Sequence, residues 1–374
     1  MNMNEQMKES EESILHTYNR FPVVFEKGQG CYLYDSEGKE YLDFAAGIAV
    51  NSLGYHYPGY DEALKDQIDK LMHISNLYYN EPIIEAGAKL VKASKMSKAF
   101  FTNSGTEAIE GALKAAKKYA YVRDGHADHE IIAMNHSFHG RSIGALSVTG
   151  TAHYREPFEP LMGGVKFADF NDLESVKAQI TDKTCAIITE VVQGEGGIYP
   201  AKKEFLEGLR QICDEKDIML IFDEIQCGMG RTGHYFAWQA YGVQPDIMTS
   251  AKALGCGVPV GALVLNEKAA KASLEPGDHG TTYGGNPFVC AAVSKVFDIY
   301  ENDKIIEHVQ EMTPYLEQKL DEIVAKHECA ATRRGMGFMQ GIVIQGRPVG
   351  EVVKAALAKG LLVISAGSDV LRIV

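Results

Sequence analysis

The chain is short of positive charge. Its 37 lysine and arginine residues are outnumbered by 50 aspartate and glutamate residues, which gives a net charge of −13. A surface with this balance repels phosphate backbones and anionic lipids, so neither nucleic acid nor a membrane surface is expected as a partner. No uninterrupted apolar run approaches the length that a bilayer span needs. The first thirteen residues are polar and acidic, lack an export signal and are predicted to be unstructured.

Cysteine is sparse as well. The seven cysteines are scattered and odd in number, and none forms a C-x-x-C pair; they stand at positions 31, 185, 213, 227, 256, 290 and 329. This distribution argues against a disulfide framework and fits a reducing compartment. We therefore expect a soluble protein that works in the cytoplasm.

Short apolar runs alternate with amphipathic helical patterns through the middle of the chain. Strands are predicted at 99–101, 130–134, 185–189, 218–222, 245–249 and 261–265, with helices from about 106 and over 203–215. Repeated strand–helix units of this kind predict an α/β fold with a mainly parallel sheet covered by helices. After long helices over 288–321, strand-like pieces at 337–344 and 361–374 flank a helix at 349–359. The length of 374 residues suits a large domain with a smaller α+β partner.

The stretch from 218 to 259 organises the rest. An apolar strand ends at Asp223, and a second short strand delivers Lys252 into a glycine-rich turn. Ligands bind beyond the carboxyl ends of parallel strands, so both side chains are expected in one crevice. A lysine that forms a Schiff base with pyridoxal phosphate, and a carboxylate that pairs with the pyridinium nitrogen, would need this arrangement. A magnesium-dependent nucleotide enzyme is the alternative, but the chain has no G-x-x-x-x-G-K-[S/T] loop.

A second signal is the turn Asn103-Ser104-Gly105, which leads into a helix near Thr106. Free N–H groups at a helix start bind anions, although the same pattern also describes an ordinary capped helix. Four histidines, His126, His129, His136 and His139, form two H-x-x-H pairs. That spacing is not the helical one of metalloenzymes, and no cysteine lies near, so no metal is predicted. Phe138 and Arg141, at a strand end, suit a planar ring and a carboxylate.

Seven motifs together resemble the class III, or omega, aminotransferases. They are GIAVNSLGYHYP (47–58), NSGTEAIEGALK (103–114), SFHGRSIGALSVTG (137–150), EVVQGEGG (190–197), DEIQCGMGRTG (223–233), AKALGCGVPVGA (251–262) and HGTTYGGNP (279–287). The resemblance covers nearly the whole chain. It implies a fold-type I pyridoxal-phosphate enzyme with a large cofactor-binding domain at 56–296. The segments 1–55 and 297–374 would form the smaller domain.

The resemblance also implies a role for each matching residue. Lys252 would form the Schiff base and shuttle the proton, and Asp223 would pair with the pyridine nitrogen. The remaining cofactor contacts would be Gln226 at the ring hydroxyl, Phe138 on the ring face, and Ser104, Gly105 and Thr106 at the phosphate. Thr282 would reach the phosphate from the neighbouring subunit of a homodimer.

Arg141 and Thr281 would contact substrate, and Glu195 would cover Arg372 until a 2-oxo acid needs that guanidinium. Two unlike substrates must use one site, and both carry carboxylates. Arginine binds a carboxylate through two hydrogen bonds and so suits this site better than lysine. This chain departs from the family's pattern at Ile109 and Val191, and we interpret both differences as variation in packing. Relatives continue beyond Val374 with a proline-rich turn and a helix, so the small domain is expected to be incomplete here.

The activity implied is transfer of the terminal amino group of N-acetyl-L-ornithine to 2-oxoglutarate, a step of arginine biosynthesis. The products are N-acetyl-L-glutamate 5-semialdehyde and L-glutamate. Ornithine, succinylornithine or 4-aminobutyrate as donor, or an aminomutase reaction on the same fold, remain alternatives. A purely structural protein would have no use for Lys252 at a strand end. The sequence leaves open the exact donor and any oligomeric order beyond a dimer.

Overall fold

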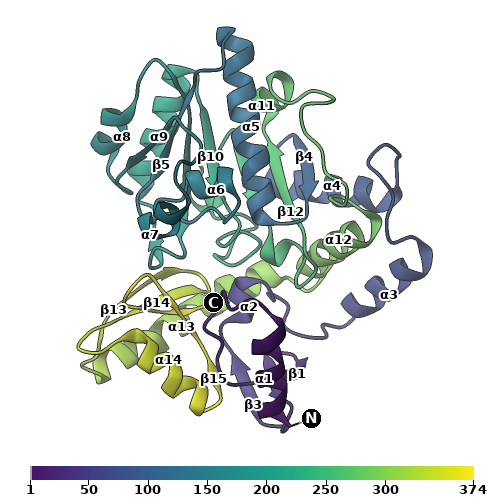
Figure 1. Ribbon diagram of the computed structural model, residues 1–374, viewed down its shortest axis with the longest axis vertical. Coiled ribbons are helices and arrows are strands. Elements are labelled where there is room, and N and C mark those ends of the chain that lie inside the picture. The colour runs from purple at the N-terminus through teal and green to yellow at the C-terminus, as the bar shows by residue number, and fades with distance from the viewer. Residues whose placement is uncertain (1) are drawn as a thin grey trace.

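A seven-stranded sheet runs through the larger part of the molecule (Figure 1). The computed structural model describes residues 2–374. In sheet order the strands are β4 (Lys98–Thr102), β12 (Gly261–Leu265), β11 (Ile247–Ser250), β10 (Met219–Asp223), β7 (Thr184–Glu190), β5 (Glu130–Met134) and β6 (Val165–Ala168). Only β12 runs antiparallel to its neighbours; β11, β10, β7, β5 and β6 are parallel to one another. The predicted mainly parallel sheet is confirmed.

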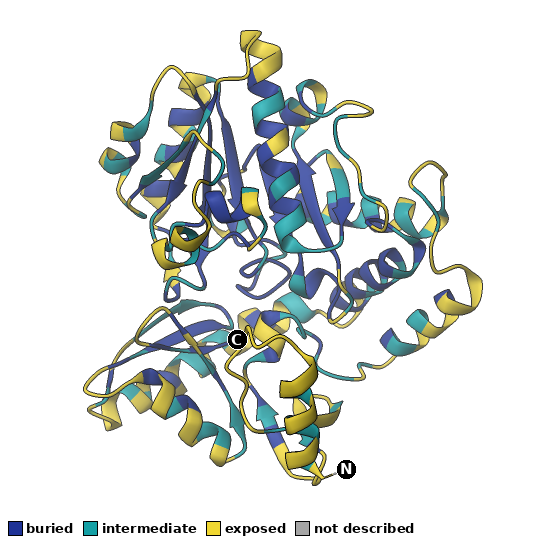
Figure 2. Cartoon of the chain, viewed as in Figure 1, coloured by how far each residue is buried: buried dark blue, intermediate teal, exposed yellow. Residues whose placement is uncertain are grey.

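Alternate residues of the central strands feed two separate cores, one on each face of this sheet. In β10, Met219 and Ile221 pack with α5 (Gly105–Asp124), whereas Leu220 and Phe222 pack with α9 (Lys203–Lys216) and α12 (Pro287–Asn302). Strand side chains point to opposite faces in turn, so a strand buried on both faces must be apolar throughout. Figure 2 shows these strands as buried along their length. Both cores therefore hold the carboxyl end of β10 in place.

Shorter elements complete the layers around the sheet. The helices are α2 (Ala46–Ala49), α3 (Tyr60–Lys70), α4 (Glu81–Ser94), α6 (Ile143–Ser147), α7 (Ala152–Arg155), α8 (Leu173–Gln179), α10 (Trp238–Tyr241) and α11 (Glu267–Ala272). Single 3₁₀ turns lie at Glu156–Phe158 and Lys252–Leu254, and the strands β8 (Val192–Gln193) and β9 (Tyr199–Pro200) pair with each other.

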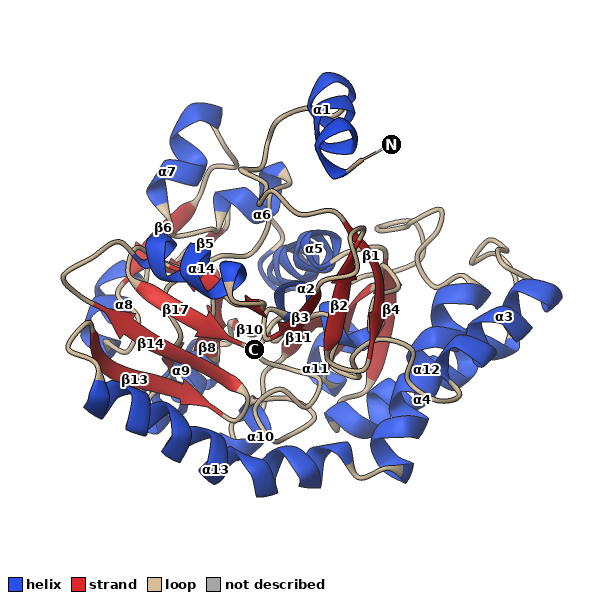
Figure 3. Cartoon of the chain, turned by 90° about the horizontal axis from the view of Figure 1, so that it is seen from below, coloured by secondary structure: helices blue, strands red, loops and turns tan. Residues whose placement is uncertain are grey.

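The two ends of the chain meet in a smaller part that lies below the main sheet in Figure 1 and is seen from below in Figure 3. An N-terminal meander of β1 (Phe25–Gln29), β2 (Tyr32–Asp35) and β3 (Glu40–Asp43) is extended by the parallel strand β15 (Leu361–Leu362). A second sheet has the order β13 (Ala330–Met336), β14 (Met339–Ile344), β17 (Val370–Ile373), β16 (Ile364–Ala366). The helices α13 (Ile305–Lys326) and α14 (Val349–Ala358) pack with this sheet around a third apolar core.

The sequence interpretation was wrong at the N-terminus. The residues predicted to be unstructured form α1 (Met3–Ser13), although none of them is buried (Figure 2). The Asn2 side chain accepts from the Glu5 amide at 3.0 Å, and the Glu5 carboxylate accepts from the Asn2 amide at 2.9 Å. This reciprocal capping box stabilises a helix without any apolar face, which is why hydrophobic periodicity did not reveal it.

The strand β13 was also not predicted, because its Arg333 and Arg334 interrupt the apolar pattern. No helix among residues 2–374 is both long enough and apolar enough to cross a membrane. The seven cysteines are free thiols.

Candidate active site

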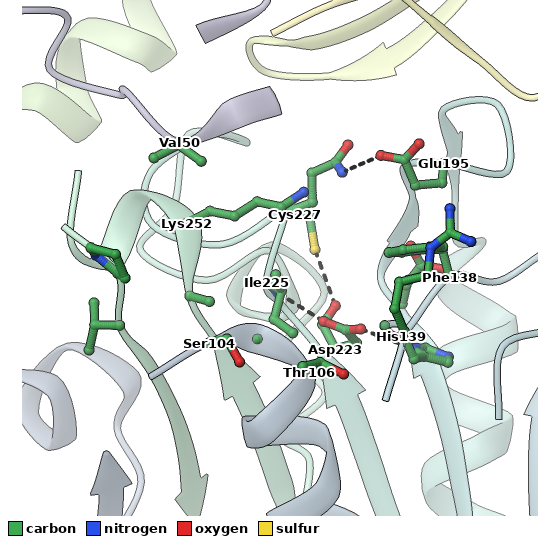
Figure 4. A pocket seen from close by; sticks show the side chains of 18 of the residues that line it. Val50, Ser104, Thr106, Phe138, His139, Glu195, Asp223, Ile225, Cys227 and Lys252 are labelled. Carbon is green, nitrogen blue, oxygen red and sulfur yellow. Dashed lines mark hydrogen bonds and ion pairs between the residues drawn. The ribbon is translucent and has the colours of Figure 1, made fainter. Parts of the chain in front are cut away.

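A cavity of about 490 Å³ opens at the carboxyl ends of the central strands (Figure 4). Most of the residues singled out from the sequence line it, namely Ser104, Gly105, Thr106, Phe138, Arg141, Glu195, Asp223, Gln226 and Lys252. They come from five separate segments of the chain. The fold therefore brings these five segments, which are far apart in the sequence, to one cavity.

Three polar side chains form a row across the strand ends. Asp223 of β10 is paired in register with Thr249 of β11 on one side and with Glu190 of β7 on the other. All three are buried, and all share the sheet face on which α5 packs, because they continue the alternation that places Ile221, Ile247 and Ile188 on that face. The row thus faces the start of α5 across the cavity.

Asp223 is held by donors from three directions. The His139 Nδ1 donates to Asp223 Oδ2 at 2.7 Å, while the Ile225 amide and the Thr249 hydroxyl donate to Oδ1 at 3.0 and 3.3 Å. The His139 side chain is fully buried, and its backbone N–H donates to the Thr149 hydroxyl at 3.0 Å. His139 was considered in the sequence only as half of an H-x-x-H pair. Its contact with Asp223 spans 84 positions and fixes both side chains.

Glu190 lies beside Asp223 in the same buried row. Burial raises the pKa of its carboxyl well above the usual range, and the neighbouring Asp223 charge adds to the rise. Its two oxygens accept from the backbone amides of Phe138 and Gly194 at 3.3 and 3.2 Å. Glu190 therefore keeps its proton to a higher pH than an ordinary glutamate does.

Lys252 reaches the cavity from an unusual backbone conformation. Its φ of 48° lies in the left-handed region, which costs about 1 kcal/mol or more for a residue with a side chain. Burial lowers the pKa of its amine to about 8, against the opposing effect of the nearby Glu195 carboxylate. About a tenth of the amine is then neutral at pH 7. A buried, strained lysine with a neutral fraction of this size is poised as a nucleophile or base.

The start of α5 provides an anion site opposite this row. Ser104 caps the 20-residue helix and accepts from the Glu107 amide at 3.4 Å, which leaves the first N–H groups free. A Cβ on Gly105 would lie 2.8 Å from Ile225 Cδ1, so a larger residue here would require the Ile225 side chain to shift. The Thr106 hydroxyl is placed by a 2.7 Å contact with the Ser142 hydroxyl.

A buried ion pair closes another side of the cavity. Arg372 of β17 is only 3% exposed, and its Nη1 donates to Glu195 Oε1 at 2.5 Å and to Gln226 Oε1 at 2.9 Å. Gln226 in turn donates to Glu195 at 3.2 Å. Burial alone would raise the pKa of Glu195, but the charge and hydrogen bonds of Arg372 outweigh it and lower that pKa. The predicted covering of Arg372 by Glu195 is the arrangement found here.

Two predicted residues lie away from the cavity. Thr281 accepts from the Asn103 side chain at 3.1 Å, and Thr282 is exposed on the surface of this chain. Arg141 lines the cavity edge but is exposed, with its guanidinium 3.9 Å from the centre of the Tyr154 ring. Thr282 therefore does not line the cavity of its own chain.

The histidine pairs do not gather at one place. His126 and His129 lie near Asp124, with their ligand atoms within 4.8 Å of one another. The Asp124 carboxylate already accepts from Arg123 at 2.6 Å through each oxygen, and from His129 at 2.9 Å. A guanidinium cation in this position disfavours a metal ion.

The cavity fits a small aldehyde-bearing aromatic phosphate such as pyridoxal phosphate. Lys252 offers an amine to the aldehyde, and Asp223 offers a buried carboxylate to a ring nitrogen. The start of α5 offers backbone N–H groups to the phosphate, and Phe138 offers an aromatic face. In Figure 4, Lys252 and Phe138 lie on opposite sides of the cavity, with Asp223 between them.

Comparisons with known proteins agree with this chemistry. The family model described as aminotransferase class-III matches residues 14–374. The acetylornithine aminotransferase of Clostridium acetobutylicum is 48% identical over 97% of this chain and 94% of the relative. The succinylornithine transaminase of Yersinia pseudotuberculosis is 44% identical over 97% of this chain and 89% of the relative. The crystal structure of the Toxoplasma gondii ornithine aminotransferase superposes with a TM-score of 0.95 at 28% identity, covering 100% of this chain and 90% of that one.

Proposed function

This chain belongs to the class-III aminotransferases, and we propose that within this family it transfers the terminal amino group of N-acetyl-L-ornithine to 2-oxoglutarate. The products are N-acetyl-L-glutamate 5-semialdehyde and L-glutamate, which makes the reaction a step of arginine biosynthesis. The enzyme is a pyridoxal-phosphate-dependent aminotransferase. The observation that carries the donor proposal is the 48% identity to the Clostridium acetobutylicum acetylornithine aminotransferase over 97% of this chain. The Arg372–Glu195 pair at the cavity wall supports a site that serves two unlike substrates.

The cofactor supplies an aldehyde that captures amines and a ring that takes up electrons from the substrate carbon. The protein's part is to hold and orient it. We assign Lys252, whose amine has a pKa of about 8, to hold the cofactor through that amine and to move a proton at the substrate carbon. Asp223, positioned by His139, would keep the ring nitrogen protonated. Ser104, Gly105 and Thr106 would bind the phosphate at the start of α5.

The remaining cofactor contacts are assigned to Phe138 and Gln226. Phe138 lines the cavity and would stack on the ring, which excludes water from one face. Gln226 would reach the ring hydroxyl. In this structure its amide bridges Glu195 and Arg372, so its position depends on that ion pair. Cofactor binding and the state of the ion pair would then be coupled.

The ion pair lets one site serve two unlike substrates. N-acetylornithine has one carboxylate, whereas 2-oxoglutarate has two. With Glu195 in place, Arg372 is neutralised, and the exposed Arg141 is left to bind the single carboxylate of the donor. When Glu195 turns away, Arg372 offers its two-donor fork to the second carboxylate of the oxo acid.

We further propose a homodimer in which each cavity is completed by Thr282 of the other subunit. Thr282 is exposed and lies outside the cavity of its own chain, which supports this placement. We propose the cytoplasm as the location, supported by seven free thiols. The division into a large domain at 56–296 and a smaller one from 1–55 and 297–374 is supported by the pairing of β3 with β15.

Turnover on a panel of amines tests the donor. N-acetylornithine, succinylornithine, ornithine and 4-aminobutyrate would each be offered with 2-oxoglutarate, and kcat/KM compared. We expect N-acetylornithine to be the best of the four. Succinylornithine is the second candidate, favoured by the 44% identity to the Yersinia transaminase. A kcat/KM for ornithine or 4-aminobutyrate that exceeds the value for N-acetylornithine tenfold or more would refute the proposal. Tenfold corresponds to about 1.4 kcal/mol.

A further inference from the structure

A second cavity, here called the basic cavity, lies between the N-terminal segment and α14. Its volume is about 1050 Å³, and its lining includes Arg20, Lys39, Lys354 and Arg372. No aspartate or glutamate belongs to this lining among residues 2–374. Four cations without an anion in one concave surface are unusual in a chain whose net charge is −13. The remaining lining is partly apolar, with Phe21 and Val353 among its members.

Two of these cations have an acidic partner outside the cavity lining. Arg20 contacts Glu11 of α1 at 3.3 Å, and Arg372 contacts Glu195. Lys39 donates to the Ala358 carbonyl at 3.1 Å and makes no ion pair within the described chain. Lys354, exposed on α14, makes no ion pair there either. Lys39 and Lys354 therefore bring positive charge to the basic cavity that no ion pair among the described residues neutralises.

Arg372 connects the basic cavity to the candidate active site. Its side chain lines the basic cavity, yet its Nη atoms donate to Glu195 and Gln226, which line the active-site cavity. A further Nη2 contact reaches the Ser365 carbonyl at 3.2 Å, while the buried Nε has no partner among the described residues. Arg372 is thus part of the wall between the two cavities, with donor capacity left over.

Charge decides which substrate such a cavity would attract. N-acetylornithine carries one carboxylate and one ammonium group and has no net charge, whereas 2-oxoglutarate is a dianion. The overall negative field of the protein repels a dianion, and the two lysines of the lining that make no ion pair, Lys39 and Lys354, oppose that effect near the site. A neutral zwitterion gains little from the same cations. The basic cavity therefore distinguishes the two substrates by charge.

We infer that the basic cavity is a binding site for short dicarboxylate anions, through which the acceptor oxo acid is collected beside Arg372. This inference rests on the proposed function for the identity of the dicarboxylate. Lys354 and Lys39, which make no ion pair among the described residues, attract the anion, and Arg372 receives one of its carboxylates when Glu195 turns away. Neither Lys354 nor Arg20 takes part in the chemical step.

The test compares the two half-reactions of the cofactor-loaded enzyme in single turnover. The variants are Lys354→Gln, Arg20→Gln and, as a matched control, Lys359→Gln, which removes an exposed lysine that lies just beyond α14 and outside the cavity lining. We expect Lys354→Gln to raise the half-saturating concentration of 2-oxoglutarate about three- to tenfold and to reduce its salt dependence. The half-reaction with the donor amine should stay unchanged in all three variants.

A binding measurement separates this inference from the proposed function. Glutarate has two carboxylates but no carbonyl to react, and its affinity for the loaded enzyme can be measured by calorimetry, with butyrate as the single-carboxylate control. Weaker glutarate binding in Lys354→Gln supports the site even if N-acetylornithine is not the donor. Equal glutarate binding in Lys354→Gln and Lys359→Gln would overturn it. A variant that weakens saturation by the donor instead of the acceptor would overturn it as well.

Discussion

Replacing Lys252 with methionine should stabilise the protein when the cofactor has been removed. Burial holds the pKa of this lysine at about 8 instead of 10.5, so folding at neutral pH forces a charge into a site that disfavours it. Each pKa unit corresponds to 1.36 kcal/mol, which gives about 3 kcal/mol of destabilisation at pH 7. Methionine has a similar length, carries no charge and removes this penalty. For a chain of 374 residues the gain corresponds to a rise in Tm of about 4 °C.

The stabilisation by Lys252→Met should depend on pH in a characteristic way. The folded pKa lies below the unfolded one, so between pH 8 and 10.5 the unfolded state binds more protons and the stability of the wild type rises with pH. Below pH 8 both states are protonated and the penalty is complete. The advantage of Lys252→Met should therefore be largest at pH 7 and shrink as the pH rises above 8.

Chemical denaturation of the cofactor-free proteins at several pH values would measure this. Lys216→Met removes an exposed lysine at the end of α9 and serves as the control, with an expected change within about 0.5 kcal/mol. The reasoning is refuted if Lys252→Met is no more stable than the wild type at pH 7, or if its advantage is the same at every pH.

Three further predictions follow from the site. His139→Asn should lower kcat/KM about ten- to a hundredfold and move the pH profile, because a buried hydrogen bond to Asp223 is worth about 1.5 to 3 kcal/mol; an unchanged profile would make His139 merely structural. Glu195→Gln leaves the buried Arg372 charge unneutralised, so we expect the free energy of unfolding to fall by about 3 kcal/mol. In the same variant we expect the half-reaction with the donor amine to be slower than the half-reaction with the acceptor oxo acid. Thr282→Ala and Lys252→Ala should each be inactive alone but regain part of the activity when their subunits are mixed, and no recovery would contradict the shared site.

Much of the main sheet could be predicted because its strands are buried on both faces. The run at 261–265 has no polar side chain, the run at 130–134 is apolar after Glu130, and the structure has strands with the same bounds. Asp223, directly after the run at 218–222, and Lys252, three residues after the strand predicted at 245–249, were found for the same reason, since a charged residue that follows a buried strand lies near its end. A strand end in a parallel sheet is where ligands bind.

What could not be predicted depends on pairing across the sheet. The contact of His139 with Asp223 requires β5 and β10 to be two strands apart, which no local pattern records. The raised pKa of Glu190 likewise follows from its burial in the sheet and, after that, from its register with Asp223. The EVVQGEGG motif drew attention to Glu195, whereas Glu190, placed just after the strand predicted at 185–189, was given no role. The contacts of His139 and Glu190 are thus determined by the order of strands in the sheet, which residue type alone does not reveal.

The helix α1 shows a different limit. Its residues have no apolar face, and its stability comes from side-chain contacts at the first turn. The basic cavity was missed for the reason that applies to His139, because Arg20, Lys39 and Lys354 are brought together only when the two ends of the chain share a sheet.

The central claim is amino transfer through Lys252 with N-acetylornithine as donor, and absorbance spectroscopy tests it most directly. The purified enzyme, loaded with pyridoxal phosphate, would be mixed with N-acetylornithine alone and then with 2-oxoglutarate. The account predicts that the visible band of the bound cofactor disappears with the amine, returns with the oxo acid, and is not formed by Lys252→Met. A band that ignores N-acetylornithine, or that forms unchanged in Lys252→Met, would contradict it.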